Sequence, residues 1–179
     1  MTTPAERIAP PTPLERFLAT LDIVHREGVH LRWSLQRMFG AGEPDADWVR
    51  ALESRPEDAE RLEAFVSRFG RMQDTIGDKL LPRWLAALSE RPASMIENLR
   101  RAERLGVLDS AEEWVAARNL RNRLVHEYQT DAETFAQDLQ LAQEAARLLL
   151  HTYDRLREDA HRRLGVPRDR LPPTLNIKI

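Results

Sequence analysis

The stretch "RNLRNRLVHEY", residues 118–128, groups side chain types that can break a phosphodiester bond without a metal ion. His126 can move a proton because a histidine titrates near neutral pH. Arg121, five residues earlier, can hold or neutralise a phosphate. Together these groups suffice to cleave RNA by attack of the 2′-hydroxyl on the adjacent phosphate.

Arg121 also lies where an apolar residue is expected. On a helical wheel that sets Trp114 at 0°, Arg121 falls at about 340°. It thus lies within the apolar stripe of Trp114, Ala117, Leu120, Leu124, Val125 and Tyr128. Burying an unpaired guanidinium is costly, so Arg121 must meet an acidic partner, reach solvent, or face a cavity or interface that needs positive charge. Asn122 and His126 lie at the edge of the stripe, with Arg118 beside them.

The residues alone allow two interpretations. In the structural one, Arg121 pairs with a carboxylate of its own chain, His126 is a surface histidine, and Tyr128 is a half-buried tyrosine at a helix end. In the functional one, Arg121 and His126 work together on a phosphate.

Composition limits the other chemistry. The chain has 179 residues and no cysteine, which excludes disulfides, thiolate catalysis and cysteine zinc sites. No pair of histidines has the spacing of a helical metal site, so we expect neither a metal nor a cofactor. We expect no membrane association and a cytoplasmic location, because no secretory signal or transmembrane run is visible. The net charge of -2 argues against non-specific binding of nucleic acid.

The helix signals are easy to recognise. Five capping-box patterns precede segments with a helical period: Thr12–Glu15, Ser54–Glu57, Ser94–Glu97, Ser110–Glu113 and Thr130–Glu133. Pro82 should kink or end the helix that contains it. No segment alternates with period two. The sequence therefore predicts an all-α protein built as an antiparallel up-and-down helical bundle.

We expect one domain over residues 1–179. An N-terminal arm and extra helix occupy residues 1–55, and the bundle occupies residues 57–163. Residues 164–179 form an extended tail, whose alternating apolar residues could dock on a partner, although a frayed terminus is the simpler expectation.

The segment "RNRLVHEY" matches the pattern Arg-x4-His-x-Tyr and resembles the HEPN superfamily, specifically the HepT-like toxins encoded beside a minimal nucleotidyltransferase antitoxin. The resemblance covers roughly residues 57–163. It implies a homodimer in which two motif helices meet and form a composite, metal-independent endoribonuclease site. Arg121 and His126 would be the catalytic pair, Asn122 and Arg118 supporting polar residues, and Tyr128 the tyrosine that the antitoxin silences by adding AMP.

Helix geometry leads to the same dimer. Arg121 and His126 are about 140° apart around one helix, so a straight helix cannot aim both at one phosphate. Either the helix distorts near its end, or a second copy completes the site across a two-fold axis.

The sequence does not decide whether the arginines near the motif form a phosphate-binding surface. Arg100, Arg101, Arg104, Arg118, Arg121 and Arg123 are interleaved with glutamates, which fits a basic groove and a solvated ion-pair surface equally well. Two rivals to the ribonuclease therefore stay open. One is a non-catalytic subunit that presents substrate to a nucleotidyltransferase, and the other is a purely structural helical protein.

Overall fold

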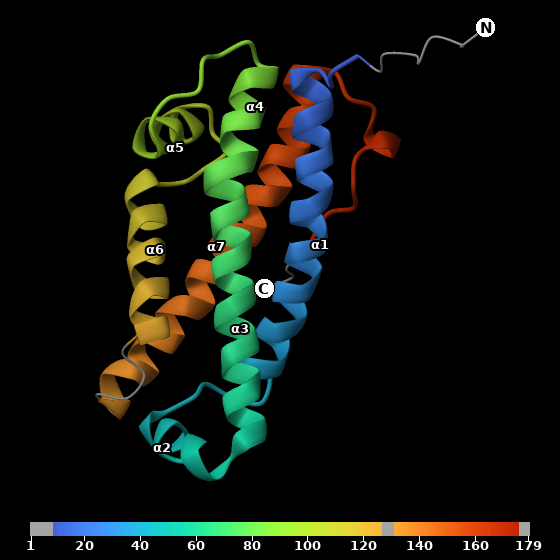
Figure 1. Ribbon diagram of the computed structural model, residues 1–179. Helices are drawn as coiled ribbons and strands as arrows, with labels where there is room; N and C mark the ends of the chain where they lie inside the picture. The colour runs from blue at the N-terminus through green and yellow to red at the C-terminus, as the bar shows by residue number, and fades with distance from the viewer. Residues whose placement is uncertain (1–8, 127–130, 176–179) are drawn as a thin grey trace, which may run out of the picture.

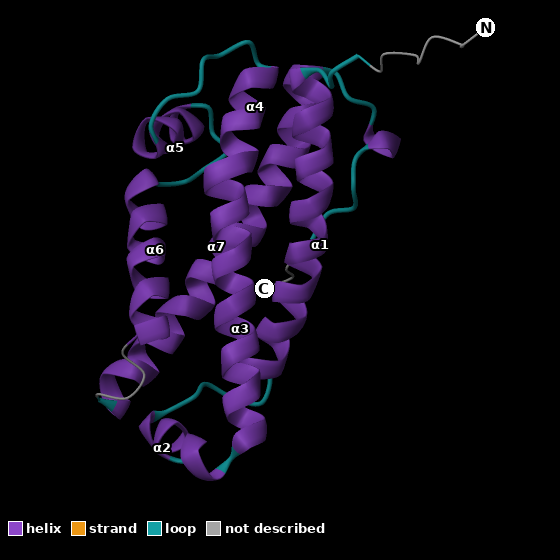
Figure 2. Cartoon of the chain, in the orientation of Figure 1, coloured by secondary structure: helices purple, strands orange, loops and turns teal. Residues whose placement is uncertain are grey.

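The computed structural model describes residues 9–126 and 131–175, and all regular elements in these ranges are helical (Figure 2). The long helices are α1 (Pro13–Phe39), α3 (Pro56–Thr75), α6 (Ala111–His126) and α7 (Ala132–Leu164). The short elements are α2 (Ala46–Arg50), α4 (Leu81–Ala87), α5 (Met95–Arg104), the 3-10 turns η1 (Leu52–Ser54) and η3 (Arg168–Arg170), and the π turn η2 (Ile76–Leu80). The prediction of an all-α protein is confirmed.

The long helices alternate in direction and form an up-and-down bundle (Figure 1). α1 runs down, α3 runs up and continues through η2 into α4, α6 runs down, and α7 runs up again. α1 packs against α3, α4 and α7, with Phe17, Leu21 and Val24 fully buried. The predicted N-terminal helix is therefore present, and it is an integral column of the bundle. Burial of such side chains is the main source of stability in helical domains.

Two capping boxes are confirmed and the others differ. The Thr12 and Ser94 boxes form with both reciprocal hydrogen bonds. Ser110 makes only half of its box, because its hydroxyl accepts from the Glu113 amide. The Ser54 prediction is wrong: α3 begins at Pro56 without a side-chain cap, since a proline at the first helical position is already preset for the helix.

The last predicted box falls partly on a residue outside the described ranges, Thr130. The N-cap of α7 is Asp131, whose carboxylate accepts from the Thr134 amide. The start of the helix was therefore placed one residue too early.

Pro82 neither ends nor sharply breaks the helical column. Its ring has no N–H and would clash with the carbonyl four residues earlier in a regular α-helix. The chain widens into η2 just before the proline, where the Leu81 amide donates to the Ile76 carbonyl, five residues back. This π turn relieves the clash, and α4 continues the column directly.

The C-terminal tail is docked on its own chain as far as residue 175. Leu175 is 1% exposed and packs on α1 at Gly28, where an added Cβ would lie only 2.2 Å from the leucine Cδ1. The Tyr153 hydroxyl of α7 donates to the Pro173 carbonyl at 2.8 Å, and burial raises the pKa of this phenol, which keeps it a donor. As far as residue 175 the tail is thus part of the core, which corrects the expectation of a frayed end for these residues. Ile177 and Ile179, the other two alternating apolar residues, lie outside the described ranges.

Candidate functional site

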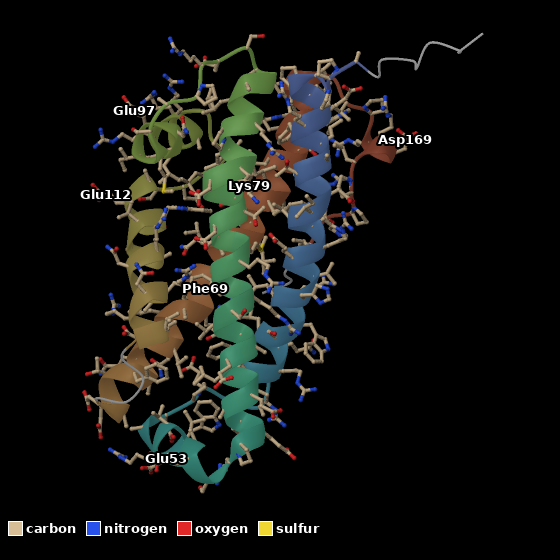
Figure 3. All side chains as sticks on the ribbon, in the orientation of Figure 1. Glu53, Phe69, Lys79, Glu97, Glu112 and Asp169 are labelled. Carbon is tan, nitrogen blue, oxygen red and sulfur yellow. The ribbon has the colours of Figure 1, made fainter. Side chains whose placement is uncertain are left out.

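A groove of about 730 Å³ lies between α3 and α6, and residues from both helices line it. Its apolar floor includes Leu62 and Val66 of α3 and Leu124 of α6. The charged lining residues are Glu63, Arg71, Asp74, Asp78, Lys79 and Arg121. In Figure 3 the labelled Lys79 lies on the α3–η2–α4 column that forms one wall. The charges of these residues balance, so the groove is not a simple phosphate trap.

Arg121 reaches this groove from α6 and meets an acidic partner there. Its Nη2 lies 2.6 Å from Oδ2 of Asp74 on α3, within a single chain. Nη1 donates to the side-chain oxygen of Asn122 at 3.2 Å. The Arg121 side chain remains 30% exposed. The misplaced arginine of the apolar stripe is therefore explained by an ion pair at a groove wall, as the structural interpretation required.

A glycine on α3 makes room for the Arg121 guanidinium. A Cβ added to Gly70 would lie 2.6 Å from Arg121 Nε, which is closer than such contacts occur. A glycine inside a helix costs about 1 kcal/mol relative to alanine, so Gly70 has to be explained by packing. Neither Gly70 nor Asp74 was predicted from the sequence, although an isolated glycine inside a helical pattern indicates close packing.

Arg118 lies one turn before Arg121 and has its own partners. Its Nη1 is 3.9 Å from Oδ1 of Asp78 and 2.7 Å from the sulfur of Met95. The π turn that precedes Pro82 contains Asp78. Arg118 and Arg121 therefore both lean toward α3 and its continuation, and the fold brings the two supporting residues, Arg118 and Asn122, next to Arg121.

His126 is the last residue of α6, and its side chain is outside what the structure describes. Tyr128 lies outside the described residues. α6 is helical without interruption from Ala111 to His126. A distortion between Arg121 and His126 is therefore absent, and the two backbone positions are about 140° apart around the axis.

The predicted apolar stripe of α6 is correct from Trp114 to Leu124 and wrong at Val125. Trp114, Ala117, Leu120 and Leu124 are all at most 4% exposed. Val125, however, is 52% exposed and lines the groove. Val125 therefore faces the groove between α3 and α6 and not the core.

The arginines near the motif form mostly ion pairs. Arg123 makes two hydrogen bonds to the buried carboxylate of Asp138 on α7, at 2.9 and 2.8 Å. Arg101 lies 3.5 Å from Glu90. With the pairs of Arg118 and Arg121, four of the six predicted arginines face a carboxylate. Most of these arginines are therefore neutralised, which fits an ion-pair surface better than a basic groove.

The described ranges contain no sign of a metal site or of a membrane-spanning helix. No three His, Asp or Glu side chains are grouped so that they could bind a metal ion in residues 9–126 and 131–175. In the same residues, no helix has the length and apolarity needed to cross a membrane. Comparison with family models, with curated proteins and with solved structures finds no match to this chain.

Proposed function

We propose that this chain is a HEPN-type endoribonuclease toxin that cleaves RNA without a metal ion, as a homodimer. The observation that supports the proposal best is the placement of Arg121. Its guanidinium lies at a groove wall and stays 30% exposed, although its position belongs to the apolar stripe of α6. The pair with Asp74 occupies one edge of the guanidinium, and the exposed N–H groups can still contact a phosphate.

In this mechanism the 2′-hydroxyl of a ribose attacks the neighbouring phosphorus, and the bond from phosphorus to the 5′ oxygen breaks. His126 takes the hydroxyl proton or supplies a proton to the leaving oxygen. Arg121 stabilises the charge that develops on the phosphate oxygens. The proton lost by the 2′-hydroxyl is balanced by the one gained by the 5′ oxygen, so the products carry a 2′,3′-cyclic phosphate and a 5′-hydroxyl and no water is consumed.

A second copy of the chain supplies the missing geometry. Arg121 and His126 lie about 140° apart on a regular helix, so one α6 cannot direct both at the same phosphate. Two copies of α6 related by a two-fold axis place Arg121 of one protomer beside His126 of the other. Asp74 then acts as a positioning residue, because it fixes one edge of the guanidinium and leaves other N–H groups for the phosphate.

The proposal also includes how the cleavage activity is switched off. A nucleotidyltransferase antitoxin adds AMP to Tyr128, two residues after His126. A bulky anion so close to the acid/base group excludes the RNA phosphate by charge and volume.

The first test is His126→Ala, assayed on total RNA with and without EDTA. We expect wild type to cleave in EDTA and to leave cyclic phosphate ends, and the variant to lose at least about 100-fold in rate, since general acid–base catalysis contributes that much. The matched control is His151→Ala, a partly buried histidine of α7, which should cleave at the wild-type rate. Equal cleavage by folded His126→Ala and wild type would contradict the proposal.

The second test shifts the guanidinium of Arg121 by changing a neighbouring residue. Gly70→Ala places a methyl group 2.6 Å from Arg121 Nε, so the guanidinium must shift. Because a misplacement of about 1 Å can cost 100-fold in rate, we expect at least a 10-fold loss of cleavage. Thermal unfolding should change little, since the roughly 1 kcal/mol that alanine adds to the helix offsets the weakening of a partly exposed ion pair.

Gly77→Ala is the matched control for this test, because its added Cβ would only make ordinary contacts with Trp114, the nearest at 3.6 Å. It should cleave like wild type. Full activity of Gly70→Ala would show that the position of Arg121 is irrelevant to cleavage.

The alternative function is a non-catalytic helical subunit that binds substrate for a nucleotidyltransferase. The Arg121–Asp74 pair favours it, because the arginine is already neutralised within its own chain. In that case the purified protein cleaves no RNA in EDTA or magnesium. Mass spectrometry would detect AMP on Tyr128 only with the partner and ATP present.

A further inference from the structure

An exposed tryptophan lies on the opposite flank of α3 from the Arg121 groove. Trp33 of α1 is 52% exposed. Its ring has two arginines beside it: the guanidinium carbon of Arg37 lies 4.8 Å from the ring centroid, and that of Arg68 on α3 lies 5.2 Å from it. Arg68 is held in place by a hydrogen bond to the Ser34 hydroxyl. Two helices therefore build one flat aromatic and cationic surface.

The arginines of this surface lack carboxylate partners in the described part of the chain. Arg37, Arg68 and Arg71 form no ion pair there, although Glu27 lines the same hollow as Arg68 and Arg71. By contrast, Arg26 on the same α1 helix is neutralised by Asp22 at 2.7 Å. Free guanidinium groups around an exposed indole are suited to phosphates and bases at once.

The surface continues toward the Arg121 groove. A shallow hollow of about 180 Å³ between α1 and α3 is lined by Glu27, His30, Arg68 and Arg71. Arg71 also lines the Arg121 groove on the other side of α3. Arg71 is thus shared by both hollows, and cationic side chains lead from Trp33 across α3 to the groove.

Charged residues of both signs line the hollow of about 420 Å³ that contains Trp33: Arg37 and Arg61, and Glu57 and Glu60 from the start of α3. The hollow toward Arg71 has one carboxylate, Glu27, beside Arg68 and Arg71. A phosphate therefore meets more net positive charge toward Arg71.

We propose that Trp33, Arg37, Arg68 and Arg71 form a binding surface for single-stranded RNA. Unpaired bases stack on the Trp33 ring and the guanidinium planes beside it, and the arginines contact the phosphates. The choice of RNA rests on the proposed function. The surface itself follows from the exposed ring and the unpaired arginines, and it leads a strand toward Arg121.

The test measures binding and cleavage separately. A fluorescein-labelled 12-nucleotide single-stranded RNA is titrated with the full chain carrying His126→Ala, and anisotropy gives Kd. Adding Trp33→Ala should weaken binding at least about 5-fold, as expected for loss of one stacked base, and Trp33→Phe should restore part of it. Ile23→Ala, which removes another exposed apolar side chain of α1, should leave Kd unchanged.

Salt dependence tests the phosphate contacts. Arg37→Ala should lower the slope of log Kd against log salt by about 0.7, the value for one phosphate contact on a single strand. Arg26→Ala should leave this slope unchanged, because Arg26 is already paired with Asp22. A duplex RNA of equal length should bind more weakly, because its bases are not free to stack.

The outcomes separate the two proposals. RNA binding that depends on Trp33, in a protein that cleaves no RNA, supports this surface and overturns the ribonuclease. Cleavage with no effect of Trp33→Ala on Kd overturns this surface and leaves the ribonuclease intact. Loss of a dimer on Trp33→Ala, seen by sedimentation without any change in RNA affinity of the monomer, would identify the surface as a protein contact and overturn the proposal.

Discussion

Replacing Leu175 with alanine is expected to destabilise the protein by about 2–4 kcal/mol, although the residue lies near the end of the chain. Leu175 is 1% exposed and packs on Gly28, where the backbone of α1 has no side chain. Its carbonyl accepts from Arg32 at 2.7 Å, and its amide donates to Asp154 at 2.8 Å. Both polar groups and the side chain therefore fix the tail between α1 and α7.

Urea unfolding followed by circular dichroism measures this effect. Leu141→Ala is the matched control, because Leu141 of α7 is 56% exposed and should lose less than about 0.5 kcal/mol. Gly28→Ala should also destabilise, since its Cβ would lie 2.2 Å from Leu175 Cδ1. In the Leu175→Ala background the same glycine substitution should cost much less, because the two residues share one space. Additive losses in the double variant would contradict docking of the tail on Gly28.

Replacing Asp159 with alanine is the other large expected loss, about 3 kcal/mol in the free energy of unfolding. Asp159 of α7 is fully buried, and its Oδ2 accepts from the indole Nε1 of Trp84 at 2.8 Å. Its Oδ1 lies 2.5 Å from Arg163 and 3.3 Å from Arg162. Alanine leaves the buried Trp84 N–H without a partner, while the two arginines are partly exposed and regain water.

The midpoint temperature of thermal unfolding measures this loss of stability. For a chain of this size about 3 kcal/mol corresponds to a fall of roughly 6–12 °C. Asp109→Ala is the control, because Asp109 forms an exposed pair with Arg155 and such pairs contribute less than about 1 kcal/mol. Asp159→Asn should lie between the two, since an amide oxygen can still accept from Trp84. Equal midpoints for Asp159→Ala and Asp109→Ala would mean that burial of this carboxylate adds no stability.

Local signals in the sequence determined the helices. Thr12 and Ser94 cap their helices with residues three positions away, so no tertiary contact is needed to recognise them. The apolar stripe of α6 was correct for Trp114 through Leu124, because burial follows the helical period wherever a neighbouring helix covers the face. The absence of period-two segments was enough for the all-α fold, and the short connections between long helices predicted their antiparallel order.

The predicted helix boundaries were wrong where two local signals compete. At the start of α3, Pro56 is preset for the first helical position, and the chain enters from the 3-10 turn η1, so Ser54 caps nothing. Pro82 was expected to interrupt its helix, but a widened turn relieves the clash at the cost of one shifted hydrogen bond. α4 therefore continues the column beyond the proline.

The candidate site was determined by the sequence only in part. The motif indicated Arg121, Asn122 and Arg118. Of these, Arg121 lines the groove, Asn122 accepts a hydrogen bond from it, and Arg118 lies 3.9 Å from Asp78, which lines the same groove. Asp74, the partner of Arg121, lies 47 positions away in the sequence, and no local pattern marks it. The same holds for Arg68 beside Trp33 and for Leu175 on Gly28.

These pairings come from the packing of helices that are distant in sequence. Capping and periodicity depend on neighbours within one or two turns, so the sequence by itself determined which segments are helical and which faces are apolar. Ion pairs, aromatic contacts and the docking of the tail depend on the rotation and register of one helix against another. Only the tertiary structure decided that Arg121 has an acidic partner, that Trp33 is exposed between arginines, and that the tail belongs to the core.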